Sequence, residues 1–376
     1  MKKLKVMTIV GTRPEIIRLS ATIKRCDEFF DQVLVHTGQN WDYTLNQVFF
    51  EDLELRQPDH FLNVVGSHLG ETMGNIIEKS YEILRKEKPD ALLILGDTNS
   101  CLSAISAKRL KIPVFHMEAG NRCYDQNVPE EINRKIVDHT SDINLTYTEH
   151  SRRNLISEGI RKDHIMVTGS PMSEVLKMQK SQIENSNILN ELGLEKDSYI
   201  VLSAHREENI DIEKNFNELI ESVNYIADKL NKKIVFSAHP RTWNKIEEKN
   251  VKLNKNVMKL KPFGFNDYNA LQKNSYCVLS DSGTLSEESA ILKFSGVLIR
   301  TSTERPEVLD KGSIVISGLE KNTIENSILI SRLSANEYKK ITPLPVDYED
   351  ENVSIKVVKI IQSYTSIVNR EIWKKG

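Results

Sequence analysis

The feature that most constrains the fold of this chain is an alternation of short apolar runs, rich in β-branched residues, with longer segments of helical period. This alternation is typical of parallel strands joined by crossover helices. One series of runs fills the amino-terminal half, and a second begins after a polar stretch at 177–197. The sequence therefore predicts an α/β protein with two Rossmann-like domains, whose parallel sheets face a cleft that collects the strand-end loops of both.

The predicted strands define the domain plan. In the first series they are 5–10, 32–37, 91–95, 114–117, 143–146 and 165–167. In the second series they are 199–202, 233–237, 257–260, 277–279, 297–299 and 314–316. Because 376 residues exceed the usual size of a single core, we expect domains at 1–172 and 173–352. The remaining residues, 353–376, repeat apolar positions at helical spacing and predict a closing amphipathic helix.

Composition and charge exclude several functional classes. A net charge of -2 without a long basic run argues against binding to nucleic acid. No apolar stretch is long enough for a membrane span or for the core of a signal peptide, so we expect a cytoplasmic protein. The four cysteines have no CxxC spacing, which argues against a zinc knuckle or a redox pair.

A turn of small residues, Asp281-Ser282-Gly283-Thr284, follows one apolar run and opens a helix. The N–H groups at the start of a helix have no intrahelical partner and, together with the helix dipole, favour an anion. The turn therefore predicts a seat for a phosphate or diphosphate. Glu288, one turn into the helix, is placed to accept hydrogen bonds from ribose hydroxyls. Ordinary helix capping explains the same pattern about equally well.

Charged residues also mark the strand ends of the first half. Arg13 follows the first run in a Gly11–Glu15 turn and suits a second anion contact. Asp97 and Glu118 follow two later runs, and Glu130 opens a helix. Acids gathered at one cleft mouth supply a general base and a general acid, since crowded carboxylates separate in pKa. Taken singly, Asp97 and Glu130 are also ordinary acids of a first helical turn. Glu118 ends a buried run, where a carboxylate is costly unless paired or used.

Histidine and arginine follow two successive runs of the second half, as His205-Arg206 and as His239-Pro240-Arg241. A single histidine in such a place is more often structural, but the two clusters together favour phosphate and proton chemistry. The turn at Gly11 lacks the glycines of the G-x-G-x-x-G fingerprint, so NAD is disfavoured as a cofactor.

In combination and in order, these motifs resemble those of the non-hydrolysing UDP-N-acetylglucosamine 2-epimerase family over nearly the whole chain. They are GTRPE at 11–15, GDT at 96–98, EAG at 118–120, PEE.NR at 129–134, HRE.N at 205–209, DSG...EE at 281–288 and ERPE at 304–307. The resemblance implies a glycosyltransferase-B-like architecture, a homodimer and a UDP-sugar held mainly by the carboxyl-terminal domain. It implies a reaction without NAD, metal or other cofactor.

The resemblance further implies that the C2 proton is removed, that UDP leaves C1 to give a 2-acetamidoglycal, and that UDP adds back after protonation on the opposite face. The implied catalytic residues are Asp97, Glu118, Glu130 and His205. The implied substrate and UDP contacts are Arg13, Arg18, Arg134, Ser282, Gly283, Thr284, Glu288 and Arg305. Which carboxylate is the base and which the acid stays open.

Several departures from the family motifs bear on the substrate. Glu207 replaces the second arginine of HRRE, which belongs to an activator site in the family. Gln39-Asn40-Trp41 replaces the usual QH, Arg18 replaces a lysine, and Thr284 replaces the second glycine of DSGG. These changes resemble the branch that converts UDP-2-acetamido-2,6-dideoxy-L-talose to UDP-N-acetyl-L-fucosamine for capsule and O-antigen synthesis. The alternatives are a UDP-GlcNAc/UDP-ManNAc 2-epimerase, a hydrolysing epimerase, a UDP-sugar glycosyltransferase of the same architecture and a UDP-sugar-binding regulator.

Overall fold

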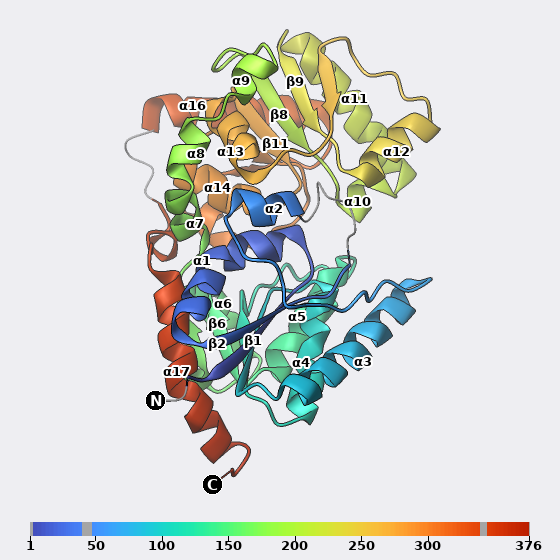
Figure 1. Cartoon of the computed structure of the whole chain (residues 1–376). Coiled ribbons are helices and arrows are strands. Elements are labelled where there is room, and N and C mark those ends of the chain that lie inside the picture. Colours follow the sequence, from blue (N-terminus) through green and yellow to red (C-terminus); the bar gives the residue numbers. More distant parts are fainter. Residues whose placement is uncertain (1–2, 40–46, 339–343, 376) are drawn as a thin grey trace. The chain divides into compact units, whose positions relative to one another are not determined.

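The computed structural model describes residues 3–39, 47–338 and 344–375 (Figure 1). The chain divides into two compact units. Unit 1 comprises Met1–Met178 with Val346–Gly376, and unit 2 comprises Gln179–Pro345. The divisions fall at 178/179 and 345/346, where the sequence analysis placed limits at 172/173 and 352/353, and the carboxyl-terminal segment returns to unit 1.

Unit 1 is built on a parallel seven-stranded sheet of order β3-β2-β1-β4-β5-β6-β7. Its strands are β1 (Lys5–Val10), β2 (Asp31–His36), β3 (His60–Phe61), β4 (Ala91–Leu95), β5 (Val114–Met117), β6 (Ile143–Thr146) and β7 (Ile165–Val167). Its helices are α1 (Arg13–Phe29), α2 (Gln47–Asp52), α3 (Leu69–Glu87), α4 (Ser103–Arg109), α5 (Pro129–Thr140), α6 (Glu149–Ser157), α7 (Met172–Met178) and α17 (Val353–Glu371). The strand order changes direction between β1 and β4, so the loops after these strands flank a topological switch point.

Unit 2 repeats this plan with a parallel six-stranded sheet of order β10-β9-β8-β11-β12-β13. Its strands are β8 (Tyr199–Ser203), β9 (Lys233–Ser237), β10 (Val257–Leu260), β11 (Cys277–Ser280), β12 (Gly296–Leu298) and β13 (Val315–Ile316). Its helices are α8 (Lys180–Glu184), α9 (Ile188–Glu191), α10 (Glu207–Ile210), α11 (Glu213–Lys229), α12 (Pro240–Glu248), α13 (Phe265–Asn274), α14 (Thr284–Leu292), α15 (Pro306–Asp310) and α16 (Lys321–Tyr338). Here the switch point lies between β8 and β11.

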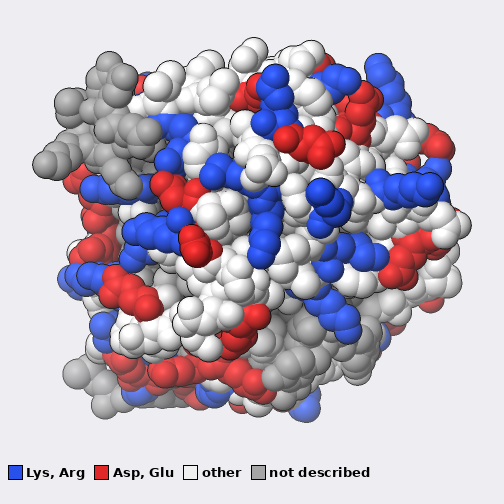
Figure 2. All heavy atoms as spheres, turned by 90° about the horizontal axis from the view of Figure 1, so that it is seen from above, with Lys and Arg blue, Asp and Glu red and all other residues white. Residues whose placement is uncertain are grey.

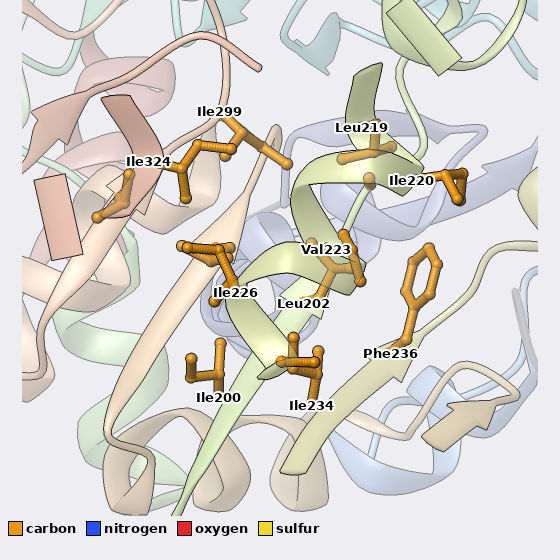
Figure 3. Packing of buried hydrophobic residues seen from close by; sticks show 14 of the residues in the cluster. Ile200, Leu202, Leu219, Ile220, Val223, Ile226, Ile234, Phe236, Ile299 and Ile324 are labelled. Atoms are coloured by element: carbon orange, nitrogen blue, oxygen red, sulfur yellow. The ribbon is translucent and has the colours of Figure 1, made fainter. Parts of the chain in front are cut away.

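The core of unit 2 lies between its sheet and the helices on one face. Ile200 and Leu202 of β8 and Phe236 of β9 pack against Val223 and Ile226 of α11, all of them buried (Figure 3). Full burial of one such aliphatic side chain stabilises the fold by roughly 1.5–3 kcal/mol. Because both faces of a parallel sheet are covered, its strands are rich in apolar residues, which explains why the sequence marks them so clearly.

The predicted α/β class with two parallel sheets is confirmed, and all twelve predicted strands are present with ends shifted by at most one residue. The prediction missed β3, because a strand of two residues has no apolar run of its own. The polar stretch 177–197 contains the two short helices α8 and α9. The closing helix is α17, which packs on α1 with Val357 and Ile361 buried.

Basic and acidic side chains are interspersed over the coloured part of the face in Figure 2. Within the described ranges, every helix is too short or too polar to cross a membrane. All four cysteines are free thiols, and Cys26, Cys101 and Cys277 are buried.

Candidate active site

At the switch point of unit 1, the buried carboxylate of Glu15 joins two strand-end loops. One oxygen accepts the N–H groups of Gly11 at 2.5 Å and Thr12 at 2.7 Å, in a capping box at the start of α1. The other oxygen accepts the hydroxyl of Thr98 at 2.8 Å and that of Ser100. Burial raises the pKa of Glu15, and these hydrogen bonds lower it by less, so that the pKa lies above its ordinary value. The turn after β1 and the loop that carries Asp97 are therefore held together by one side chain.

Glu118 follows β5 with a backbone φ of 64°, in the left-handed region that a residue with a side chain rarely adopts. Its carboxylate forms an ion pair with the guanidinium of Arg18 on α1, and both side chains are largely buried. Asn121 Nδ2 donates to Glu118 Oε1 at 3.3 Å, and the hydroxyl of buried Tyr147 lies 3.5 Å from Glu118 Oε2. Uncommon backbone conformations of this kind concentrate at functional sites.

Helix α5 brings a second ion-pair cluster to the same switch point. The Arg134 guanidinium lies 2.7 Å from Asp97 Oδ2 through Nε and 2.8 Å from Glu131 Oε2 through Nη1. Asn133 Nδ2 donates to the Asp97 carbonyl at 2.9 Å. The Asp97 side chain remains 22% exposed, which leaves it accessible to a ligand. The structure thus brings Asp97 and Arg134 together, while Arg18 lies with Glu118.

The two remaining predicted residues of unit 1 lie on the first turns of helices. Arg13 begins α1, and its guanidinium carbon lies 5.6 Å from the ring centre of Phe49 on α2, a cation–π distance. Glu130 is half-buried in the first turn of α5, next to Glu131, whose carboxylate accepts from Arg134 and from the N–H groups of Cys123 and Tyr124.

In unit 2, Asp281 directly follows β11 and is fully buried. Its carboxylate accepts the backbone N–H groups of His205 at 2.9 Å and Arg206 at 3.0 Å, together with Asn209 Nδ2 at 3.1 Å. His205 Nδ1 lies 3.1 Å from its Oδ1. Burial alone would raise the pKa of Asp281, but His205 and Arg206 and these hydrogen bonds lower it to about 2. Asp281 is therefore an anion at neutral pH.

The predicted anion seat lies at the start of α14. Ser282, Gly283 and Thr284 are all half-buried, and the hydroxyls of the serine and threonine are 3.0 Å apart. A Cβ on Gly283 would lie 2.5 Å from Glu304 Oε1, so the turn has room only for glycine unless Glu304 moves. Arg300 Nη1 holds that carboxylate at 2.9 Å. The Glu304 side chain thus packs closely against the backbone of the turn.

The two acids of α14 differ in their surroundings. Glu288 accepts from Gln272 Nε2 at 2.9 Å and is 5% exposed. Glu287 is fully buried and pairs with Arg305 Nη2 at 3.3 Å. Arg305, itself only 1% exposed, already contacts a carboxylate, and its assignment as a UDP contact stays a prediction.

The predicted residues divide between the two units. Those in unit 1 are Arg13, Arg18, Asp97, Glu118, Glu130 and Arg134, and those in unit 2 are His205, Ser282, Gly283, Thr284, Glu288 and Arg305. Sequence reasoning assigned no role to Glu15, Tyr147 or Asp281. A signal existed for Asp281, a carboxylate that directly follows a buried strand. Within the described part of the chain, no three His, Cys, Asp or Glu side chains are grouped so that they could hold a metal ion.

Comparison with known proteins places this chain among sugar-nucleotide enzymes. Residues 23–362 match the family model described as UDP-N-acetylglucosamine 2-epimerase. A curated UDP-N-acetylglucosamine 2-epimerase of Methanocaldococcus jannaschii is 36% identical over 337 residues, which cover 87% of this chain and 92% of the relative. The chain belongs to the UDP-N-acetylglucosamine 2-epimerase family. The predicted family and enzyme class, a UDP-sugar 2-epimerase, are therefore confirmed.

Solved structures of family members share the fold over their full length. The UDP-N-acetylglucosamine 2-epimerase of Rickettsia bellii has a TM-score of 0.92 and 45% identity, covering 99% of this chain and 100% of that one. The M. jannaschii enzyme in complex with UDP-GlcNAc and UDP has a TM-score of 0.89 and 34% identity, covering 96% and 99%. The predicted glycosyltransferase-B-like fold is thus confirmed.

The family also contains enzymes named for other substrates. A UDP-2,3-diacetamido-2,3-dideoxy-D-glucuronate 2-epimerase of Pseudomonas aeruginosa is 32% identical over 328 residues, covering 86% of this chain and 91% of the relative. The two names differ in the groups at C3 and C6 of the sugar, and both describe a 2-epimerase. Membership of the 2-epimerase family therefore fixes the carbon that reacts more firmly than the sugar.

Proposed function

We propose that this protein inverts C2 of a UDP-N-acetylhexosamine by eliminating UDP and adding it back. A carboxylate takes the C2 proton while the C1–O bond breaks and its electron pair leaves with UDP, which gives a 2-acetamidoglycal. UDP then returns to C1 as a second acid delivers a proton to the other face of C2. The observation that carries this proposal is Glu118, an arginine-paired carboxylate held in a left-handed conformation at the switch point of unit 1.

The two units have separate tasks in this reaction. Asp97, Glu118 and Glu130 of unit 1 supply proton transfer, and Arg18 and Arg134 keep two of these carboxylates in place. In unit 2, Ser282, Gly283 and Thr284 present the start of α14 to the diphosphate, and Glu288 accepts from the ribose hydroxyls. Arg13 and Arg305 supply additional cationic contacts to UDP.

His205 stabilises the negative charge that develops on UDP as the bond to C1 breaks. Its ring is 30% exposed and is held from behind by Asp281. Because the C2 hydrogen beside an acetamido group is only weakly acidic, the reaction depends on the departure of UDP. A positioned cation at the leaving group lowers that barrier, since a preformed charge does not have to reorganise during the reaction.

For the substrate, we favour UDP-2-acetamido-2,6-dideoxy-L-talose, with UDP-N-acetyl-L-fucosamine as the product for capsule or O-antigen synthesis. The support is the departures from the family motifs. Glu207 stands where relatives carry an arginine, and it pairs with Arg241 at 2.8 Å in an exposed contact. Arg18 replaces a lysine beside Glu118. Asn40 and Trp41, part of another departure, lie outside the described residues. The alternative is interconversion of UDP-GlcNAc and UDP-ManNAc.

The test is incubation with a panel of UDP-HexNAc and 6-deoxy UDP-HexNAc donors in heavy water without any acceptor. An epimerase incorporates deuterium at C2 and gives two epimers of the intact UDP-sugar. Absence of exchange with every donor contradicts epimerisation and favours a glycosyltransferase or a binding regulator. Free sugar and UDP as final products favour a hydrolysing epimerase. Exchange with UDP-GlcNAc but not with the 6-deoxy-L-talose donor contradicts the substrate assignment alone.

We further propose that the protein acts as a homodimer in the cytoplasm. Helix α5 exposes Ile132 and Ile136, four residues apart on the same side of the helix, at 55% and 36%. Apolar side chains in such a stripe suit a contact with a second copy of the chain. Sedimentation velocity tests this proposal: a dimer is expected, and Ile132→Lys should shift it toward monomer. A monomeric wild-type protein contradicts it.

A further inference from the structure

We propose that Asp281 is a positioning residue that fixes the tautomer of His205, so that the other ring nitrogen, Nε2, faces the leaving UDP. This inference deepens the proposed function and rests on it for the role of His205 in the reaction. It gives a role to Asp281, the first residue of the DSG motif, and it assigns each ring nitrogen a task.

The geometry places a carboxylate beside His205 Nδ1. Asp281 Oδ1 lies 3.1 Å from Nδ1, and the carboxylate has no exposed surface. A carboxylate at this distance requires N–H on the ring nitrogen, since two acceptors repel each other. In neutral His205 the proton therefore lies on Nδ1, and the lone pair lies on Nε2.

The carboxylate itself is held rigidly by the backbone. The N–H groups of His205 and Arg206 and the Asn209 amide all donate to it, so it keeps its orientation whether or not the ring is charged. The pKa of Asp281 of about 2 means that it stays anionic over the pH range in which a histidine titrates.

The outer side of the ring is available to a ligand. The His205 side chain is 30% exposed, and within the described residues Nε2 has no hydrogen-bond partner. The ring of His239, at the start of α12, is a neighbour of this ring, with ring centres 6.2 Å apart.

The test reads the tautomer directly. The protein is labelled with ¹⁵N-histidine, and the signals of His205 are assigned by their loss in His205→Gln. Wild-type protein without substrate is expected to show the Nδ1–H form when neutral. In Asp281→Asn the amide no longer requires a proton on Nδ1, so this preference is lost. Turnover should then fall about 1,000-fold to 10,000-fold, the size seen when the aspartate of a catalytic triad becomes asparagine. The Kd for UDP by calorimetry should change less than about threefold.

Asn209→Ala is the matched control, because it removes another donor to the same carboxylate and leaves the contact with Nδ1. It should retain the Nδ1–H form and keep turnover within about tenfold of wild type, if loop packing is the only loss. An Nε2–H form in the wild-type protein overturns the proposal, whether or not Asp281→Asn folds. Wild-type turnover in Asp281→Asn also overturns it. Because the tautomer is measured without substrate, failure of the heavy-water exchange contradicts the proposed function separately.

Discussion

The switch points of the two units follow the same plan but hold their carboxylates differently. In unit 1, Glu118 and Asp97 each contact an arginine side chain from a helix, Arg18 or Arg134. In unit 2, Asp281 is held mainly by backbone N–H groups and an amide. The sheet topology brings strand-end loops together in both cases, and the loops decide the chemistry. An acid held by another side chain depends on the position of that side chain, whereas an acid held by the backbone has a fixed position.

The largest loss of activity is expected from a substitution of Glu118. Glu118→Gln keeps the shape of the side chain but removes the charge and the proton acceptor, so C2 exchange in heavy water should fall about 1,000-fold. The Kd for UDP should stay within about threefold, because the UDP contacts are assigned mainly to unit 2 and do not include Glu118. Glu149→Gln, an exposed acid of α6, is the control and should exchange at the wild-type rate. Wild-type exchange by Glu118→Gln would remove this residue from the catalytic set.

The low pKa of Asp281 in unit 2 should make the free energy of unfolding depend on pH in the acid range. The folded pKa of Asp281 is about 2, below its ordinary value of 3.8, so its contribution is present above about pH 4 and is lost as the pH falls toward 2. That contribution is about 2 kcal/mol. Amide exchange of peptides covering β8 and β11 should therefore accelerate about 30-fold over this range, relative to intrinsic rates. In Asp281→Asn this acceleration should be absent, and an equal acceleration in both proteins contradicts the assignment.

The sequence predicts the local features of this site but not its contacts between residues that are far apart in the chain. The strand β11 and the turn after it were predictable, because a buried parallel strand is an apolar run and the turn uses small residues. The contact between Arg18 and Glu118 was not, because the pair is separated by 100 positions and depends on how α1 packs on the sheet. The same holds for Asp281 and His205, which the register of β8 beside β11 brings together.

The left-handed backbone of Glu118 also has no sequence signal, because such a conformation normally requires glycine or asparagine. Local rules predict another residue there, and the surrounding contacts override them. Positions where local preference and observed structure disagree are expected at functional sites. Glu118 was nevertheless singled out from the sequence, because a carboxylate at the end of a buried strand is costly unless it is used.

A smaller effect is expected at Glu288, which tests the division of tasks between the units. Glu288→Ala removes the proposed acceptor of the ribose hydroxyls and should weaken UDP binding about tenfold, or about 1.4 kcal/mol. Exchange at C2 under saturating substrate should stay within about threefold of wild type. Calorimetry with UDP provides the measurement, and Glu247→Ala on α12 provides an exposed control in the same unit. Unchanged affinity for UDP would contradict the ribose role.

The smallest effect should come from Arg18→Lys, which asks how adjustable the acid of unit 1 is. Lysine keeps the positive charge beside Glu118 but replaces a planar guanidinium by a single ammonium, so the carboxylate is aimed less firmly. We expect kcat for epimerisation to fall about threefold to tenfold, with the Kd for UDP unchanged. Arg18→Met removes the charge from a buried ion pair and should cost far more, because it leaves Glu118 without this cation in a largely buried site. Equal losses in the lysine and methionine variants would mean that guanidinium geometry, rather than charge, holds Glu118, and the contrast with the backbone-held Asp281 would then narrow.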